Sequence, residues 1–177
     1  NNPPKSDGGP YLYMFNHVSM FDQFMIGAYV NHYITAVAAI ETFRYPIFGF
    51  ILKKYGIIPI IRQKIKKALV SLKAAEEEME KGTSFLISPE GTRTLTGEIG
   101  PFKKGPFHLA LNTNATIVPV ALKGGFRAKK KSDWRLYPGV LTVVFGDPIK
   151  SIHYEKLNIE ELRDLISKKI IELKKRR

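Results

Sequence analysis

Short apolar runs alternate with longer amphipathic runs along most of this chain, and this alternation restricts the possible fold more than any other feature. Six apolar runs have the length and the β-branched or aromatic content of buried strands. Several of the intervening segments have helical spacing, as in Lys64–Lys81, where Leu69 and Leu72 lie on one apolar stripe and Gly82 follows. The pattern predicts an α/β fold, with a single layer of mixed, largely parallel sheet flanked by helices.

The boundaries of the elements can be estimated from the same pattern, and the 177 residues suffice for one domain with a substantial core. We expect a loop over Gly124–Gly139, because six basic residues and one acid lie between Lys123 and Arg135. The predicted strands are Tyr11–Phe15, Ile34–Ile40, Ile57–Ile61, Ser84–Ile87, Ile117–Leu122 and Val140–Phe145, and the predicted helices are Ser19–Val30, Lys64–Lys81, one beginning at Gly105-Pro106, and Ile159–Leu173.

The composition restricts the chemistry. The absence of cysteine excludes disulfides, thiolate metal sites and a cysteine nucleophile, and the net charge of +12 indicates an anionic partner. No apolar run reaches the roughly 20 residues that a membrane-spanning helix needs. Because the chain begins Asn1-Asn2-Pro3-Pro4 without an initiating methionine, we expect a single domain cut from a longer protein, without an N-terminal membrane-anchoring segment.

The turn after the first predicted strand, Asn16-His17-Val18-Ser19-Met20-Phe21-Asp22, contains the first candidate active-site residues. On one helix His17 and Asp22 would point about 140° apart, so they can meet only if His17 precedes the helix and Asp22 reaches back from its first turn. That contact would fix one imidazole tautomer and leave the other ring nitrogen as a base. The alternative is a helix cap by Ser19, with His17 an ordinary turn residue; the two arrangements are compatible.

A second polar turn, Ser88-Pro89-Glu90-Gly91-Thr92-Arg93, follows the predicted strand Ser84–Ile87 directly. Parallel α/β sheets bind ligands beyond the carboxyl ends of their strands, so this turn lies where a site would form. Gly91 allows close approach of the backbone, and Glu90 and Arg93 supply an acceptor and a guanidinium donor. Taken alone, the turn is equally consistent with a charged surface turn closed by a Glu–Arg ion pair.

Taken together, the two turns resemble the glycerolipid acyltransferase family, which contains the 1-acylglycerol-3-phosphate acyltransferases. His17 and Asp22 match its first sequence block, His-x4-Asp, and Pro89-Glu90-Gly91-Thr92-Arg93 matches its third. Gly56–Arg62 and Ile117–Leu122 resemble the second and fourth blocks, in the correct order and spacing, and Phe102–Phe107 resembles the segment between the third and fourth. The chain departs from the family pattern at Ile60-Ile61, where the second block often has Phe-Ile-Asp before the arginine, and at Ser88, which replaces phenylalanine.

The resemblance implies transfer of a fatty acyl group from acyl-CoA or acyl-carrier protein to the free hydroxyl of a lysophospholipid, above all 1-acylglycerol 3-phosphate, giving phosphatidic acid. His17 is the expected general base, oriented by Asp22, in a direct transfer without a covalent enzyme intermediate. Pro119 is expected to shape the acyl side of the site, and neither a cofactor nor a metal is expected. The resemblance assigns the phosphate of the acceptor to Arg62, Glu90, Gly91, Thr92 and Arg93.

A lysophospholipid acceptor lies in the bilayer, so we expect the site to open at an anionic membrane surface, on the cytoplasmic face. The candidate contacts are the basic pair Lys53-Lys54, the cluster Arg127–Arg135, and Phe43–Leu52 as a shallow apolar insertion. For Phe43–Leu52 the alternative is a place in the core. The remaining histidines, His32, His108 and His153, lack matching partners nearby and are interpreted as structural or exposed.

Three other functions fit parts of the sequence. The acceptor could be glycerol 3-phosphate or another lysolipid, or water could replace it in a hydrolase that uses the same base. A nonenzymatic domain that binds nucleic acid or anionic lipid would explain the +12 charge and the terminal Lys174-Lys175-Arg176-Arg177. It would not explain the four ordered blocks, and no RNA-binding signature is present, so we expect no nucleic-acid partner.

Overall fold

The computed structural model describes residues 3–4, 9–61 and 65–176, and in this part of the chain the strands form one six-stranded sheet. Its strand order is β3-β2-β4-β1-β5-β6. Strands β1 to β5 are parallel, and β6 pairs antiparallel with β5. The predicted fold class is therefore confirmed. The strands are β1 (Tyr11–Phe15), β2 (Ile34–Ala39), β3 (Ile58–Ile60), β4 (Ser84–Ile87), β5 (Thr116–Lys123) and β6 (Thr142–Phe145).

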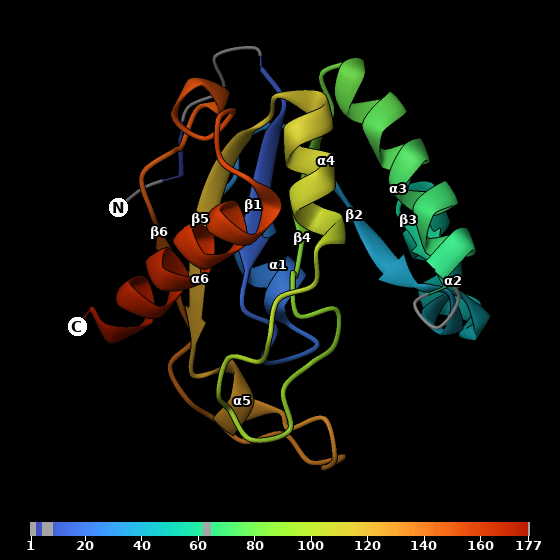
Figure 1. Cartoon of the computed structure of the whole chain (residues 1–177). Coiled ribbons are helices and arrows are strands. Elements are labelled where there is room, and N and C mark those ends of the chain that lie inside the picture. Colours follow the sequence, from blue (N-terminus) through green and yellow to red (C-terminus); the bar gives the residue numbers. More distant parts are fainter. Residues whose placement is uncertain (1–2, 5–8, 62–64, 177) are drawn as a thin grey trace.

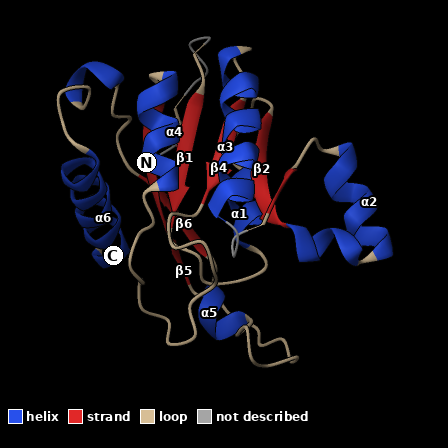
Figure 2. Ribbon diagram, turned by 45° about the vertical axis from the view of Figure 1, so that its right-hand side comes forward, coloured by secondary structure: helices blue, strands red, loops and turns tan. Residues whose placement is uncertain are grey.

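Helices cover both faces of this sheet (Figures 1 and 2). The helices are α1 (Asp22–Gly27), α2 (Pro46–Lys54), α3 (Ile65–Glu80), α4 (Gly105–Thr113), α5 (Gly125–Ala128) and α6 (Ile159–Lys175), with 3-10 turns η1 (Ile40–Arg44) and η2 (Ser151–His153). The four predicted helices are present, although α1 is shorter than the predicted Ser19–Val30. Two were not predicted: α2, and the single turn α5 inside the predicted loop Gly124–Gly139.

The central strand β1 shows why the sheet needs cover on both sides. Leu12 and Met14 belong to the core cluster that includes residues of α3, α4 and α6, whereas Tyr11, Tyr13 and Phe15 belong to the cluster that includes residues of α1. Figure 1 shows α4 and α6 in front of the sheet and α1 behind it. Because neighbouring side chains point to opposite faces and both faces are buried, the strand is apolar throughout rather than alternating.

Helix α2 differs from the rest of the fold because its apolar side chains are largely exposed. Ile47 is 79% exposed and Phe50 is 61% exposed, whereas Leu52 is buried. A Cβ at Gly49 would lie 2.2 Å from the carbonyl oxygen of Phe43, so glycine lets α2 pack closely on η1. The interpretation of Phe43–Leu52 as core is therefore wrong for most of its side chains. Within the described residues, no helix combines the length and the apolar character that a bilayer crossing requires.

Candidate active site

His17 lies in the turn after β1, and Asp22 is the first residue of α1. Their side chains meet: His17 Nδ1 is 2.7 Å from Asp22 Oδ2. The predicted geometry, with the histidine before the helix and the aspartate reaching back from its first turn, is confirmed. Because the carboxylate accepts this bond, Nδ1 carries the proton and Nε2 of a neutral imidazole is left as the basic nitrogen.

Backbone donors fix the Asp22 carboxylate in place. Asp22 is completely buried, and its oxygens accept N–H bonds from Val18 at 2.7 Å and from Ser19 at 3.0 Å. The alternative in which Ser19 caps the helix is not formed: Phe21 occupies the N-cap position without a side-chain bond, and Ser19 Oγ accepts only a long bond from Phe21 N at 3.4 Å. The Asp22 side chain itself orders the residues ahead of the helix, and these bonds hold its carboxylate in place at Nδ1 of the imidazole.

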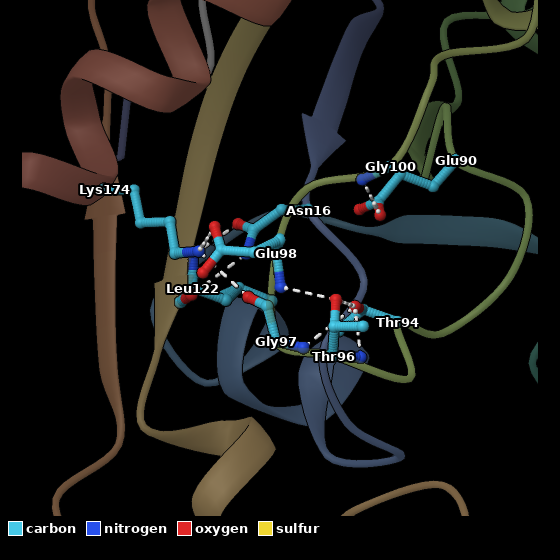
Figure 3. A network of polar contacts seen from close by, with 9 residues as sticks. All are labelled: Asn16, Glu90, Thr94, Thr96, Gly97, Glu98, Gly100, Leu122 and Lys174. Carbon is cyan, nitrogen blue, oxygen red and sulfur yellow. Dashed lines mark hydrogen bonds and ion pairs between the residues drawn. The ribbon is translucent and has the colours of Figure 1, made fainter.

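The main chain of His17 is bonded directly to the segment after β4. Its N–H donates to Glu90 Oε1 at 2.7 Å, and its carbonyl accepts from the N–H of Thr94 at 2.9 Å. The other oxygen of Glu90 accepts from the N–H of Gly100 at 2.8 Å (Figure 3). Burial raises the pKa of Glu90, and the two backbone N–H bonds oppose that rise. Glu90 therefore joins both turns through backbone contacts.

Asn16 fixes the end of β1 from the other side. Its amide pairs with the backbone of Leu122, accepting from the N–H at 2.7 Å and donating to the carbonyl at 3.1 Å (Figure 3). The Asn16 side chain thus takes the place of a backbone partner beyond the end of β1. It pairs with both the N–H and the carbonyl of Leu122, which is fully buried in β5. Because His17 is the next residue, this pairing also holds the backbone of His17 in place.

Gly91 leaves room for a cation in the turn after β4. Its φ of +69° lies in the left-handed region, and a Cβ would come 3.0 Å from Lys103 Nζ and 3.1 Å from the Cδ and Cε atoms of Lys103. Lys103 is held over the turn by its own N–H bond to the carbonyl of Pro89, at 2.9 Å. Any larger residue at Gly91 would displace the lysine side chain.

These turns border a cleft of about 1680 Å³ beyond the carboxyl ends of β1, β2, β3 and β4. Residues of β2, β3, α2 and α3 form an apolar part of its wall, and the polar part comes from the turns after β1 and β4 and from the loop after α5. The apolar part includes Val37, Ala38, Phe48, Leu52, Ile60 and Leu72, and the polar part includes His17, Gly91, Thr92, Arg93, Lys103 and Lys131.

The predicted site residues fall into three groups. His17, Gly91, Thr92 and Arg93 line the cleft, with Asp22 behind the histidine. Arg62 lies outside the described residues. Glu90 does not line the cleft, and both of its carboxylate oxygens accept backbone N–H bonds, which favours a positioning role over direct contact with a phosphate.

Pro119 is also placed differently from the prediction. It lies in the middle of β5, and its ring carbon Cγ would be 2.9 Å from a Cβ at Gly146, where β6 has ended. Its carbonyl accepts from the N–H of Gly146 at 2.8 Å, and the residue is absent from the cleft wall. Pro119 therefore contacts the residue that follows β6, and its expected effect on the acyl side of the site stays a prediction.

The family model described as "Acyltransferase" matches residues 1–123, which include both turns and the first five strands. The chain belongs to the acyltransferase family.

Individual relatives of this acyltransferase-family chain agree with that assignment. A 1-acyl-sn-glycerol-3-phosphate acyltransferase of Cocos nucifera is 34% identical over 93% of the chain and 56% of its own length. One from Borreliella burgdorferi is 31% identical over 98% of the chain and 70% of its own length. The crystal structure of the 1-acyl-sn-glycerophosphate (LPA) acyltransferase PlsC from Thermotoga maritima has a TM-score of 0.84, with 25% identity, over 99% of the chain and 70% of that chain. The chain thus spans little more than half of the Cocos relative.

Several residues of the acyltransferase site could not be chosen from sequence. Lys103 and Lys131 line the cleft, and so does His108, which is exposed as expected. Ser88 also lines it, and within the described residues its buried Oγ has no hydrogen-bond partner. Lys103 could have been suspected from the Phe102–Phe107 resemblance, whereas Lys131 gave no signal beyond the charge of its loop.

Two further observations concern other kinds of site. A smaller pocket of about 350 Å³ lies beside His32 and Ser84, and none of the predicted site residues lines it. Within the described part of the chain, no three His, Asp or Glu side chains are grouped closely enough to hold a metal ion.

Proposed function

We propose that this chain is the catalytic domain of an O-acyltransferase that transfers a fatty acyl group from acyl-CoA or acyl-carrier protein to 1-acylglycerol 3-phosphate, giving phosphatidic acid. The observation that carries the proposal is one cleft whose wall combines the Asp22-bound His17, cationic side chains and a broad apolar surface. An anionic lipid acceptor and a thioester with a long alkyl chain need these three elements together. Its relatives bear the name of that activity.

In the proposed reaction His17 Nε2 removes the proton of the acceptor hydroxyl while the hydroxyl oxygen attacks the thioester carbonyl. The carbon–sulfur bond then breaks, and the thiolate leaves as free thiol after taking up a proton. A thioester is already activated, so the base that makes the alcohol nucleophilic is the main requirement, contributing about 10²–10⁴ in rate. Asp22 stabilises the imidazolium that forms, and no covalent enzyme intermediate is needed.

Within the described residues, the proposed contacts for the acceptor phosphate are Arg93, Thr92 and Gly91; Arg62, which lies outside them, is proposed from the family resemblance alone. An arginine fork can bind two phosphate oxygens at once and thereby orient the acceptor as well as attract it. Lys103 lies close against Gly91 in the same cleft wall and adds a further positive charge. The apolar wall from β2, β3, α2 and α3 is the proposed place of the acyl chains.

We also propose that α2 contacts the membrane from which the acceptor is taken. The exposed Ile47 and Phe50 belong to the helix that contributes Phe48 and Leu52 to the cleft wall, and Lys53 and Lys54 end that helix. Apolar residues next to lysines suit the boundary between acyl chains and anionic headgroups. The charge of +12 favours the anionic cytoplasmic leaflet, where each basic residue near the surface contributes about 1 kcal/mol.

The reaction is tested by following free thiol from acyl-CoA in neutral detergent with and without each acceptor. We expect release that depends on 1-acylglycerol 3-phosphate, that is lost in His17→Ala, and that is retained in His153→Ala, since His153 lies exposed in η2. Release without acceptor would establish a hydrolase. Preference for glycerol 3-phosphate or for another lysolipid would move the proposal to that acceptor. No release with either acyl-CoA or acyl-carrier-protein donors would leave a nonenzymatic binder.

Membrane contact is tested separately by sedimentation with vesicles of anionic and neutral lipid. Ile47→Ser should weaken binding to anionic vesicles, whereas Ile152→Ser, the same change at an exposed isoleucine in η2, should not. Equal effects of the two substitutions would contradict a specific role for α2.

A further inference from the structure

Lys131 enters the cleft from a part of the chain that none of the family blocks includes. It lies in the loop between α5 and β6, and its Nζ donates to Thr92 Oγ1 at 3.0 Å. Thr92 belongs to the turn after β4, so this bond brings the loop to the site, where both residues line the wall.

Among the described residues, Lys131 has no carboxylate partner, and the acid of its own loop is already bonded elsewhere. Its one acid, Asp133, accepts two bonds from the Arg135 guanidinium at 3.0 Å and one from the hydroxyl of Tyr137 at 3.2 Å. These contacts lower the pKa of Asp133 to about 2. The loop is closed at its base by the N–H of Tyr137 bonded to the carbonyl of Ala128 at 2.9 Å.

Arg93 and Lys103 share the cleft wall with Lys131. Among the described residues, neither Arg93 nor Lys103 forms an ion pair, whereas the neighbouring Lys104 is paired with Glu160. Glu41 lines the cleft as well, in η1, and is not paired with any of the three. Three unpaired positive charges around one cleft repel each other, and a bound anion relieves that repulsion.

Resting on the acyl transfer proposed above, we propose that Lys131 and Thr92 act as one unit that binds the phosphate of the acceptor. The ammonium group has three donors, of which one is used on Thr92. Thr92 Oγ1 accepts that bond and keeps its own hydroxyl hydrogen to donate. The pair therefore offers several N–H and O–H donors to the oxygens of one phosphate monoester, whose charge near neutral pH lies between −1 and −2.

The neighbouring lysine provides a matched control. Lys130 Nζ lies 5.6 Å from the centre of the Phe126 ring, and Lys130 does not line the cleft. Lys130→Met and Lys131→Met change the net charge equally, so a general electrostatic attraction predicts equal effects for both. Recognition of phosphate predicts an effect at Lys131 alone.

The experiment measures kcat and KM in neutral detergent, with 1-acylglycerol 3-phosphate and with monoacylglycerol, which has no phosphate. We expect Lys131→Met to raise KM for the phosphate acceptor about tenfold and to leave KM for the acyl donor and the rate with monoacylglycerol within about twofold. Lys130→Met should stay within about twofold throughout. Equal effects of the two variants, or a raised KM for the donor instead of the acceptor, would overturn the proposal.

A binding measurement keeps this inference separate from the proposed reaction. Trp134 is the one tryptophan of the sequence and lies three positions from Lys131, so its fluorescence reports on the loop. Titration with 1-acylglycerol 3-phosphate should change the emission of the wild type and of Lys130→Met, and require about tenfold more ligand in Lys131→Met. If wild type binds in this way but turns over no donor, the proposed reaction fails and this inference stands; if the two variants titrate alike, this inference fails.

Discussion

Replacing Glu90 by glutamine tests whether this carboxylate positions the site rather than contacting a ligand. In the structure its two oxygens accept N–H bonds from His17 at 2.7 Å and Gly100 at 2.8 Å, and the residue is 6% exposed. Glutamine has the same shape but only one acceptor oxygen, so its amide N–H₂ group would face one of the two backbone donors.

The expected loss follows from these contacts. A hydrogen bond to a charged group contributes about 1.5–3 kcal/mol, and leaving a buried N–H unsatisfied adds a further cost, while removing a buried charge offsets part of it. We therefore expect Glu90→Gln to lower the free energy of unfolding by about 2–3 kcal/mol. For a domain of this size, the corresponding fall in Tm is about 4–12 °C.

The loss should also depend on pH with a defined sign. Burial raises the pKa of Glu90 in the native state, so between its ordinary and its raised value the native state binds more protons than the unfolded state. The stability of the wild type relative to Glu90→Gln therefore decreases as pH rises through that window. Chemical unfolding of both proteins across the window measures the difference.

Glu98→Gln is the matched control, because Glu98 lies in the same segment, is 84% exposed and has only a 3.5 Å ion pair with Lys174 (Figure 3). It should change stability by less than about 0.5 kcal/mol. In activity assays Glu90→Gln should lower kcat, because His17 loses a backbone anchor. If Glu90→Gln is as stable as Glu98→Gln and changes only the KM of the acceptor, Glu90 contacts substrate and our explanation is refuted.

Three other substitutions probe the same framework. Asn16→Asp removes the donor to the carbonyl of Leu122 and should lower the free energy of unfolding by about 3 kcal/mol near neutral pH. This loss should shrink in acid, where the protonated carboxyl can donate. A loss that chemical unfolding shows to be independent of pH would contradict this explanation. In Gly91→Ala the alanine must adopt a φ of +69° and displace the Lys103 side chain. Thermal unfolding should therefore show a stability lower by about 1–2 kcal/mol, and activity assays should show a raised KM for the acceptor. An unchanged KM would show that Lys103 is not needed. Ser88→Ala removes a buried hydroxyl without a partner among the described residues and should raise stability by up to about 1 kcal/mol; a loss of stability would mean that the hydroxyl is satisfied.

The sequence was sufficient to predict the sheet and the meeting of His17 with Asp22. Strand β1 is apolar at every position, which marks a strand covered on both faces, and the five-residue spacing allows a contact only across the start of a helix. The same patterns failed for Phe43–Leu52, because apolar content alone does not distinguish a buried helix from an exposed one.

The contacts of Glu90, Pro119 and Lys131 could not be predicted from local patterns for a different reason. Each depends on a partner far along the chain: the N–H of His17 for Glu90, Gly146 for Pro119, and Thr92 for Lys131. A charged residue in a ligand-binding turn can face the ligand or the backbone, and only the three-dimensional arrangement decides between them. For Asn16 the long-range partner, Leu122, likewise explains a residue that the sequence offered only as part of a motif.

The central claim, that His17 is the base, is tested most directly by the kcat of His17→Asn for transfer to 1-acylglycerol 3-phosphate. The amide nitrogen of asparagine can replace Nδ1 as the donor to Asp22, so the variant removes Nε2 while keeping the hydrogen bond that orders the turn. We predict that kcat falls by about 10²–10⁴ with the KM of the acceptor little changed. A kcat within a few-fold of the wild type would show that another group accepts the proton.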